Sequence, residues 1–405
     1  MRSIFLFCLI LPLCLDVRAD DWPIYRGPNH NGISQETGWK SSWKTPPKIL
    51  WRARVGLGHS SFSVANGKAY TLGNSANQDT VFCFDAVSGK QLWKHSYAAD
   101  KGAKFYPGGT HSTPTVDPAT DTVYILGKQG QLHALDATEG SIKWFKNVVR
   151  ELGLGRRDVG TWGLGGSPLI INDRLYLNAG AGGACLNKND GGVIWRSRGK
   201  SGFSTPLPYS TGNQEALAFF TARSVVGVDA KNGRQLWSFP WTTQYDVNAV
   251  DPVFTSGNTL FISSAYNVGG AIYAIRENTG RSVWRTKNMI NHFNSCVYLG
   301  GHLYGIHGHA DKTRGELRCL DARTGRVVWS DRSVELGSLM IADGKLVVIS
   351  EMGTLMIAEA TPKGFRTTGR VQALGPKCWA APVLANGLVY VRNARGDVAC
   401  VDLRK

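Results

Sequence analysis

The sequence lacks several features that would identify a chemistry directly. It has no pair of adjacent cysteines, no nucleophile motif, no phosphate-cradling glycine loop and no helical zinc signature. It also has no helix-turn-helix, no zinc finger and no run of basic residues, which argues against a nucleic-acid partner. The glycine-rich stretch around Trp162 precedes no helix pattern, so its glycines are expected to allow tight backbone turns.

The N-terminus has too short an apolar run to cross a bilayer. The run from Ile4 to Leu15 has 12 residues, whereas a membrane-spanning helix needs roughly 20. Arg2 precedes this run, and the small residue Ala19 follows it, as a signal-peptidase site requires. We therefore predict a signal peptide over residues 1–19, export to the periplasm or the outside of the cell, and no transmembrane helix after cleavage. A lipoprotein would use Cys14, but the leucine and proline before it suit such a site poorly.

Acidic residues are fewer than basic ones. The chain has 46 Lys and Arg against 30 Asp and Glu, and removal of residues 1–19 leaves 44 against 29, a net charge of about +15. This balance favours acidic partners, such as an anionic polysaccharide, lipid head groups or an acidic protein face. The alternative is that the charge is spread over a solvated surface.

Instead of single motifs, the chain contains one repeated motif. Six copies place a turn residue eight positions before a tryptophan: FCFDAVSGKQLW, HALDATEGSIKW, ACLNKNDGGVIW, VGVDAKNGRQLW, YAIRENTGRSVW and RCLDARTGRVVW. A shortened seventh copy has Glu359 and Phe365 at these positions, and an eighth ends the chain after Asp402. From Asp85 to Asp402 the spacings are 51, 51, 42, 47, 45, 38 and 43 residues, close to the roughly 40 to 50 residues of a four-stranded propeller blade.

The motif predicts a hairpin. Its aspartate would cap the turn by accepting backbone N–H bonds, its glycine would take a positive φ, and its tryptophan would lie in the next strand. A further strand pair precedes each hairpin, with inner segments near Phe62, Pro114, Pro168, Pro206, Pro252, Cys296, Leu339 and Pro382. We therefore predict an all-β, eight-bladed β-propeller of four-stranded antiparallel blades over residues 49–405.

The two ends of the repeat region predict how the ring closes. The eighth hairpin lacks its final strand. The segment from Ile49 to Trp51 has the pattern of a final strand, but no hairpin precedes it. Pairing the two would remove the exposed edges of an open array. Residues 20–48 carry turn residues and little periodicity, so we expect them to form an N-terminal arm lying on the ring.

The cysteines do not predict disulfides. Six remain after export, and four of them occupy one equivalent position of the repeat: Cys83, Cys185, Cys319 and Cys400. Equivalent positions on different blades should lie beyond the roughly 7 Å that a disulfide tolerates between Cα atoms. We expect free, buried thiols, with Cys378 the one candidate for reactivity.

The Asp-x-x-x-Gly-x-x-x-Trp pattern over residues 82–402 resembles the repeat of PQQ-like (pyrroloquinoline quinone) β-propellers. That repeat occurs in quinoprotein alcohol dehydrogenases and in BamB-like lipoproteins that scaffold outer-membrane protein assembly. The N-terminal DWPIYRGPNHNG and the early ILW also resemble exported PQQ-like proteins of bacteria. The resemblance implies the fold, whereas the enzymes' vicinal cysteine pair and the lipoproteins' lipidated cysteine have no clear counterpart here.

In a propeller, the loops that lead into the innermost strands gather around one end of the central channel, which we call the mouth. Together with the middle loops they predict a ligand-binding cluster of His59, His111, Trp162, Phe203, Arg223, Asn248, His292, Asn294, His307 and Trp379. Such side chains could stack on and hydrogen-bond a flat or sugar-like ligand, or they could cap strands and pack the mouth. Further candidates are Asn267, His309 and Asp311, and the carboxylates Asp158, Asp246 and Asp251.

Some of these residues are also candidates for a metal site. His59, His111 and His292 carry metal-binding groups, but they come from different blades and no short ligand spacing supports them. His307 and His309, two residues apart with Asp311 nearby, also have donor types that a metal uses, yet lone surface histidines are commoner, so no metal site is predicted. No catalytic residue is predicted either.

The sequence thus leaves two hypotheses. The leading one is an exported, non-catalytic binding or scaffold protein, a monomer that binds an envelope protein or glycan. The alternative is a quinoprotein-type oxidoreductase in which a PQQ-like cofactor stacks on Trp162 or Trp379.

Overall fold

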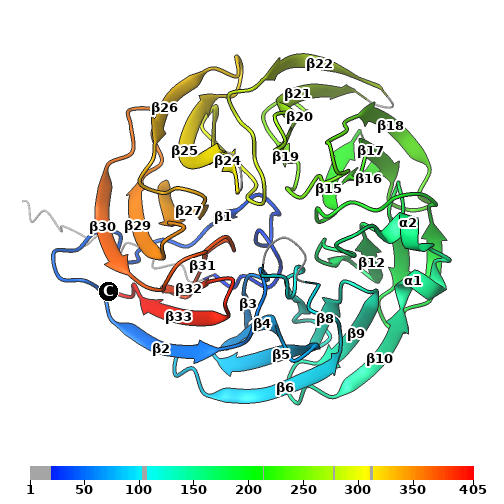
Figure 1. Cartoon of the computed structure of the whole chain (residues 1–405), viewed down its shortest axis with the longest axis horizontal. Coiled ribbons are helices and arrows are strands. Elements are labelled where there is room, and N and C mark those ends of the chain that lie inside the picture. Colours follow the sequence, from blue (N-terminus) through cyan, green and yellow to red (C-terminus); the bar gives the residue numbers. More distant parts are fainter. Residues whose placement is uncertain (1–19, 103–106, 213, 277–278, 311–312) are drawn as a thin grey trace, which may run out of the picture.

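The computed structural model describes residues 20–102, 107–212, 214–276, 279–310 and 313–405. The predicted signal peptide, residues 1–19, lies outside them, and so does Asp311. Eight sheets stand as blades around a central axis (Figure 1), and each contains four antiparallel strands. The predicted all-β, eight-bladed propeller is therefore confirmed.

Blades 1 to 4 follow one another along the chain. Blade 1 consists of β3 (Ser63–Ala65), β4 (Lys68–Ser75), β5 (Gln78–Asp85) and β6 (Gln91–Ala98). Blade 2 consists of β7 (Thr115–Asp117), β8 (Thr122–Leu126), β9 (Gln131–Asp136) and β10 (Ile142–Asn147). Blade 3 consists of β11 (Leu169–Ile171), β12 (Arg174–Leu177), β13 (Ala184–Asn187) and β14 (Val193–Arg196). Blade 4 consists of β15 (Leu207–Thr211), β16 (Gln214–Phe220), β17 (Ser224–Asp229) and β18 (Gln235–Pro240).

Blades 5 to 8 complete the ring. Blade 5 consists of β19 (Val253–Phe254), β20 (Thr259–Ser264), β21 (Gly269–Arg276) and β22 (Thr279–Thr286). Blade 6 consists of β23 (Val297–Leu299), β24 (His302–His309), β25 (Thr313–Asp321) and β26 (Val327–Asp331). Blade 7 consists of β27 (Ser338–Ala342), β28 (Lys345–Ile349), β29 (Thr354–Glu359) and β30 (Thr367–Gln372). Blade 8 consists of β31 (Val383–Ala385), β32 (Leu388–Arg392), β33 (Asp397–Asp402) and β2 (Ile49–Arg54).

The described part of the chain has two helices, both between blades 2 and 3. They are α1 (Val148–Glu151) and α2 (Arg156–Val159), of four residues each. Neither these nor any other described segment forms a helix that could span a membrane.

The ring closes as the sequence predicts. Strand β2 pairs antiparallel with β33, with Trp51 opposite Cys400, and the two strands lie side by side at the left of Figure 1. Arg392 on β32 is 1% exposed, and its guanidinium donates to the carbonyl oxygens of Gly56 and Ser60 at 3.2 and 3.0 Å. These bonds fasten blade 8 to the chain that enters blade 1.

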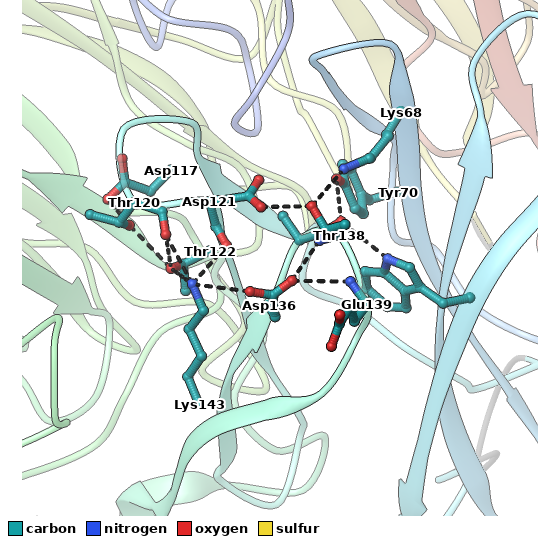
Figure 2. A network of polar contacts seen from close by, with 12 residues as sticks. Lys68, Tyr70, Asp117, Thr120, Asp121, Thr122, Asp136, Thr138, Glu139 and Lys143 are labelled. Carbon is teal, nitrogen blue, oxygen red and sulfur yellow. Dashed lines mark hydrogen bonds and ion pairs between the residues drawn. The ribbon is translucent and has the colours of Figure 1, made fainter.

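The repeated turn has the predicted geometry. Asp136 accepts the backbone N–H groups of Thr138 and Glu139 at 2.8 and 3.0 Å, and these bonds hold the pKa of its carboxyl below the usual range. Gly140 has a φ of 75°, which favours glycine. Figure 2 shows this turn from close by, with Lys68 of blade 1 beside Thr138, to which its ammonium donates at 3.2 Å.

The motif tryptophan joins six of the eight blades to the next one. Its indole N–H donates to a backbone carbonyl of the following blade's turn in six pairs, at 2.9 to 3.1 Å: Trp51 and Ala86, Trp93 and Ala137, Trp144 and Lys188, Trp195 and Ala230, Trp284 and Ala322, and Trp329 and Thr361. The ring packs on the turn's glycine, since a Cβ on Gly140 would lie 2.5 Å from Trp93. Trp237 is an exception and donates to the Tyr209 hydroxyl.

The six cysteines of the described residues are free and buried, as predicted. The four at the equivalent repeat position each lie opposite a tryptophan, as Cys83 does opposite Trp93. Burial raises the pKa of Cys378 to about 12, so this thiol is not poised for reaction at neutral pH.

The first part of the N-terminal arm (residues 20–48) enters the centre of the ring, whereas Trp43 lies against the outer strand β30 of blade 7. Trp22 exchanges two backbone hydrogen bonds with Val64 of blade 1, at 2.8 and 2.9 Å. Further on, the Arg26 side chain donates to the Cys296 carbonyl of blade 6 at 2.8 Å, and β1 (Ile33–Ser34) adds a parallel strand to β27 of blade 7. The arm thus crosses the channel from one side of the ring to the other, as the blue trace in Figure 1 shows.

Candidate functional site

A cavity of about 130 Å³ lies at the channel mouth. Its side walls are aromatic, formed by His59, His111, Trp162, Phe203, Phe293 and Trp379. Its inner end is lined by Tyr25 of the arm, by Asp251 and by three hydroxyl residues, Thr113, Ser167 and Thr205. The entry loops of seven blades, all except blade 7, therefore contribute to one small, largely apolar space.

One wall belongs to a column of stacked rings. The column runs in the order His309, His292, Phe293, Trp379 and His59, with consecutive ring centroids 3.7 to 5.5 Å apart and planes inclined by 13 to 26°. On the opposite side Trp162 and Phe203 meet edge to face, 6.4 Å apart. Aromatic pairs prefer such offset and edge-to-face arrangements, so both walls are mutually supported.

Trp379 is held in place by its own contacts. Its indole N–H donates to Oε1 of Glu351 at 3.0 Å, and the ammonium of Lys377 lies 5.6 Å from its ring centroid. A hydrogen bond to a carboxylate and a cation over the ring both fix the plane of an indole. Trp379 is therefore a rigid wall rather than a side chain that must reorient on binding.

A belt of hydrogen bonds to side chains links the entry loops of blades 1 to 6 around part of the channel. In each step a backbone N–H of one blade donates to a side-chain oxygen of the next blade, at 2.7 to 3.2 Å. The steps run from Ser61 to Thr113, Thr113 to Ser167, Ser167 to Thr205, Thr205 to Asp251 and Asp251 to Ser295. The belt satisfies backbone groups that blade-to-blade packing would otherwise leave buried and unpaired.

The groups around the cavity carry an unusual charge distribution. Burial lowers the pKa of His59 to about 3, assisted by His111 and by the charges of Arg392, Lys128 and Lys377. At neutral pH the histidines are therefore uncharged, and the surrounding cations set a positive field. Burial raises the pKa of Asp251 to about 6, although Arg26 and the Thr205 N–H oppose this shift.

We expect removal of the Glu351 carboxylate to loosen Trp379. Glu351→Ala should lower the free energy of unfolding by about 1 kcal/mol, because it removes a hydrogen bond at a partly exposed site. The Trp379 indole N–H should then exchange faster with solvent, which hydrogen exchange followed by NMR of the indole signal measures. Glu351→Gln is the control, since its side-chain oxygen can still accept the bond, and equal exchange in both variants would contradict the positioning role.

Five of the ten predicted site residues line the cavity: His59, His111, Trp162, Phe203 and Trp379. His292 stands directly behind Phe293, at a centroid distance of 3.7 Å. The structure therefore gathers the aromatic members of the predicted cluster.

The other predicted residues have their side chains turned to other partners. Asn248 donates to three backbone carbonyls, those of Thr221, Ala222 and Trp241. Asn294 donates to the Gly337 carbonyl, and His307 Nδ1 lies 3.0 Å from the Arg318 guanidinium. Arg223 is an exposed residue that forms two bonds with Asp246, at 2.9 and 3.0 Å.

Sequence reasoning missed the belt and Tyr25. A signal for the belt exists, because four of its members directly precede a proline at the start of a blade: Thr113, Ser167, Thr205 and Asp251. A residue before proline is held extended, which fixes where its side chain points. Tyr25 lies in the arm, outside the repeat, so no repeat position could have placed it at the channel.

The cavity does not suit a calcium and quinone site of the dehydrogenase kind. Ligands of drug size usually occupy roughly 300 to 1,000 Å³, whereas this cavity measures about 130 Å³. Among the described residues that line it, Asp251 is the one carboxylate, and its Oδ1 already accepts the Thr205 N–H. In the described part of the chain, no three His, Cys, Asp or Glu side chains are grouped to hold a metal ion.

A family model described as outer membrane protein assembly factor BamB matches residues 34–144 and 77–331. BamB of Shewanella oneidensis is 24% identical over 385 residues, which cover 88% of this chain and 89% of that protein.

Solved structures share the architecture. BamB from Moraxella catarrhalis aligns with a TM-score of 0.63 at 16% identity, covering 88% of this chain and 98% of its own. A quinohemoprotein alcohol dehydrogenase from Comamonas testosteroni aligns with a TM-score of 0.66 at 13% identity, covering 95% and 81%. At such identities these structures establish the fold alone. Because the family model spans most of the repeats, the chain belongs to the PQQ-like β-propeller family described as outer membrane protein assembly factor BamB.

Proposed function

We propose that this protein is a non-catalytic binding or scaffold protein of the cell envelope and that it acts in outer membrane protein assembly. Its curated relatives are named for that process, and one of them matches over 89% of its own length. The predicted signal peptide agrees with an envelope location. Its partner would be an envelope protein that binds at the channel mouth, and the propeller would act as a monomer.

The observation that carries this proposal is the rigidity of the mouth. Its walls are fixed by ring stacking and by the Glu351 bond to Trp379, and the arm lines the inner end of its cavity. A pre-formed pocket with fixed walls favours recognition, because little conformational freedom is lost on binding. The buried histidines have their pKa lowered to about 3 at His59 and His111, which suits packing better than proton transfer near neutral pH.

The proposal predicts capture of defined envelope partners. We expect the mature protein, cross-linked in intact cells and purified under denaturing conditions, to bring down outer membrane proteins or components of their assembly machinery. The control bait is an unrelated exported protein of similar basic charge. Recovery of the same proteins by both baits would contradict a specific scaffold role.

The quinoprotein alternative makes a different prediction. Titration of the purified protein with PQQ and calcium should give no saturable change in the quinone absorbance and no dye reduction, because the cavity is small and holds one carboxylate. Saturable binding accompanied by dye turnover would replace the scaffold proposal with an oxidoreductase.

A further inference from the structure

The cavity at the mouth has room for one aromatic ring. A closed apolar cavity of roughly 150 Å³ is enough to hold benzene, and this cavity measures about 130 Å³. Its two aromatic walls, Trp379 with Phe293 on one side and Trp162 with Phe203 on the other, suit a flat group inserted between them. A single ring could therefore enter, while the rest of its molecule would remain on the face outside.

The inner end of the cavity selects a ring with a polar tip. Thr113, Ser167 and Thr205 each use their hydroxyl oxygen to accept a backbone N–H, so each retains an O–H to donate. Asp251 lies on the same belt and can accept a hydrogen bond. A phenolic hydroxyl, which both donates and accepts, matches this set better than a phenyl ring does.

The rim of the mouth resembles a protein-binding surface. Tyr245 is 51% exposed and packs edge to face on Tyr266, 5.4 Å away. Arg223 has a 70% exposed side chain and shares the Asp246 carboxylate with Lys200, so two cations face one anion there. Lys377 stands over Trp379. Tyrosine, tryptophan and arginine are the residues that dominate binding energy at protein interfaces. The cations also favour acidic residues on the side of the partner.

We propose that the mouth cavity receives one tyrosine side chain from an acidic, extended segment of an envelope protein partner. This inference rests on the proposed function, because it names the feature by which the scaffold would recognise its partner. The tyrosine would act as the buried anchor, with its ring between the two aromatic walls and its hydroxyl at the belt. Flanking acidic residues would face Arg223 and Lys377.

Defined peptides test this recognition. The probe is an acetylated and amidated nonapeptide of Asp, Glu, Ser and Gly with one central tyrosine, and binding is measured by saturation-transfer NMR and by tryptophan fluorescence. We expect the phenylalanine version to bind about threefold to tenfold more weakly, because it loses the hydroxyl contacts, and the leucine version more weakly still. Lysines in place of the acidic residues should also weaken binding.

Two variants of the protein locate the site. Ala249 lines the cavity, so Ala249→Phe should fill it and reduce the affinity for the tyrosine peptide by about tenfold or more. Trp162→Leu removes one wall and should have a similar effect even if the first variant fails to fold. The matched control is Val193→Phe, which places the same ring on the exposed outer strand β14 and should bind as the unaltered protein does.

The outcomes separate this inference from the function on which it rests. Absence of tyrosine-peptide binding, equal binding of the leucine peptide, or unchanged binding by folded Ala249→Phe and Trp162→Leu would overturn the tyrosine anchor. If those results came with normal cross-linking to envelope partners, the scaffold function would stand without it. Conversely, tyrosine-selective binding lost in both variants would support the anchor even if cross-linking recovered no partner.

Discussion

Replacing Trp51 with alanine is expected to lower the free energy of unfolding by about 3 to 5 kcal/mol. Trp51 is 8% exposed, and its indole donates to the Ala86 carbonyl at 3.1 Å. The ring packs on Gly89, where an added Cβ would lie 2.3 Å from it. The substitution removes a large buried side chain and one hydrogen bond to the Ala86 carbonyl, which keeps its bond from the Tyr390 hydroxyl at 3.1 Å. Urea unfolding followed by circular dichroism measures the loss.

Trp195→Ala is the matched control for this variant. Trp195 has the same contacts within the continuous part of the chain, with 9% exposure and a 3.1 Å bond to the Ala230 carbonyl. We expect a similar loss of stability in both variants. In Trp51→Ala alone, however, the amides of β2 should exchange with solvent well before global unfolding, because β2 is joined to blade 8 by pairing and not by the chain. Equal protection of β2 in the two variants would contradict this view of closure.

The fold was predictable because the main interactions of each repeat form between residues that are close together in the sequence. An aspartate that accepts two backbone N–H groups, a glycine at positive φ and a tryptophan eight residues after the aspartate all belong to one turn and its strand, as at Asp136 and Gly140. Ring closure could also be predicted, since β2 supplies the fourth strand that the last repeat, which ends with β33, lacks. The path of the arm was not, because residues 20–34 obey no repeat.

The site was predictable in position but not in orientation. Repeat position placed Trp162 and Trp379 at the mouth, and both line the cavity. It placed Asn248 and Asn294 there by the same logic, yet their amides bond to backbone carbonyls instead. Which way a loop side chain turns depends on the unpaired backbone groups around it, and those are set by tertiary contacts that the sequence does not display.

At pH 8, Glu36→Gln is expected to raise the free energy of unfolding by about 3 kcal/mol. Glu36 is 2% exposed, one carboxylate oxygen accepts the Gly387 N–H, and the other has no hydrogen-bond partner. Burial raises its pKa from 4.5 to about 7. The folded protein therefore keeps a proton that the unfolded chain releases, so stability falls as the pH rises from about 4.5 to 7 and stays low above that. Glutamine imitates the protonated form at every pH.

The difference in unfolding free energy between the unaltered protein and Glu36→Gln reports on this one carboxyl, because other titrating groups such as Asp251 are the same in both. Urea unfolding should give similar stabilities near pH 4.5 and a growing advantage for Glu36→Gln up to about pH 7, beyond which it stays constant. Glu359→Gln, at an exposed position on β29, is the control for the substitution itself. Because Glu36 fastens the arm to blade 8, the Gly387 amide should also exchange more slowly in Glu36→Gln at pH 8. A stability difference that is the same at pH 5 and pH 8 would show that the buried carboxyl is not the cause.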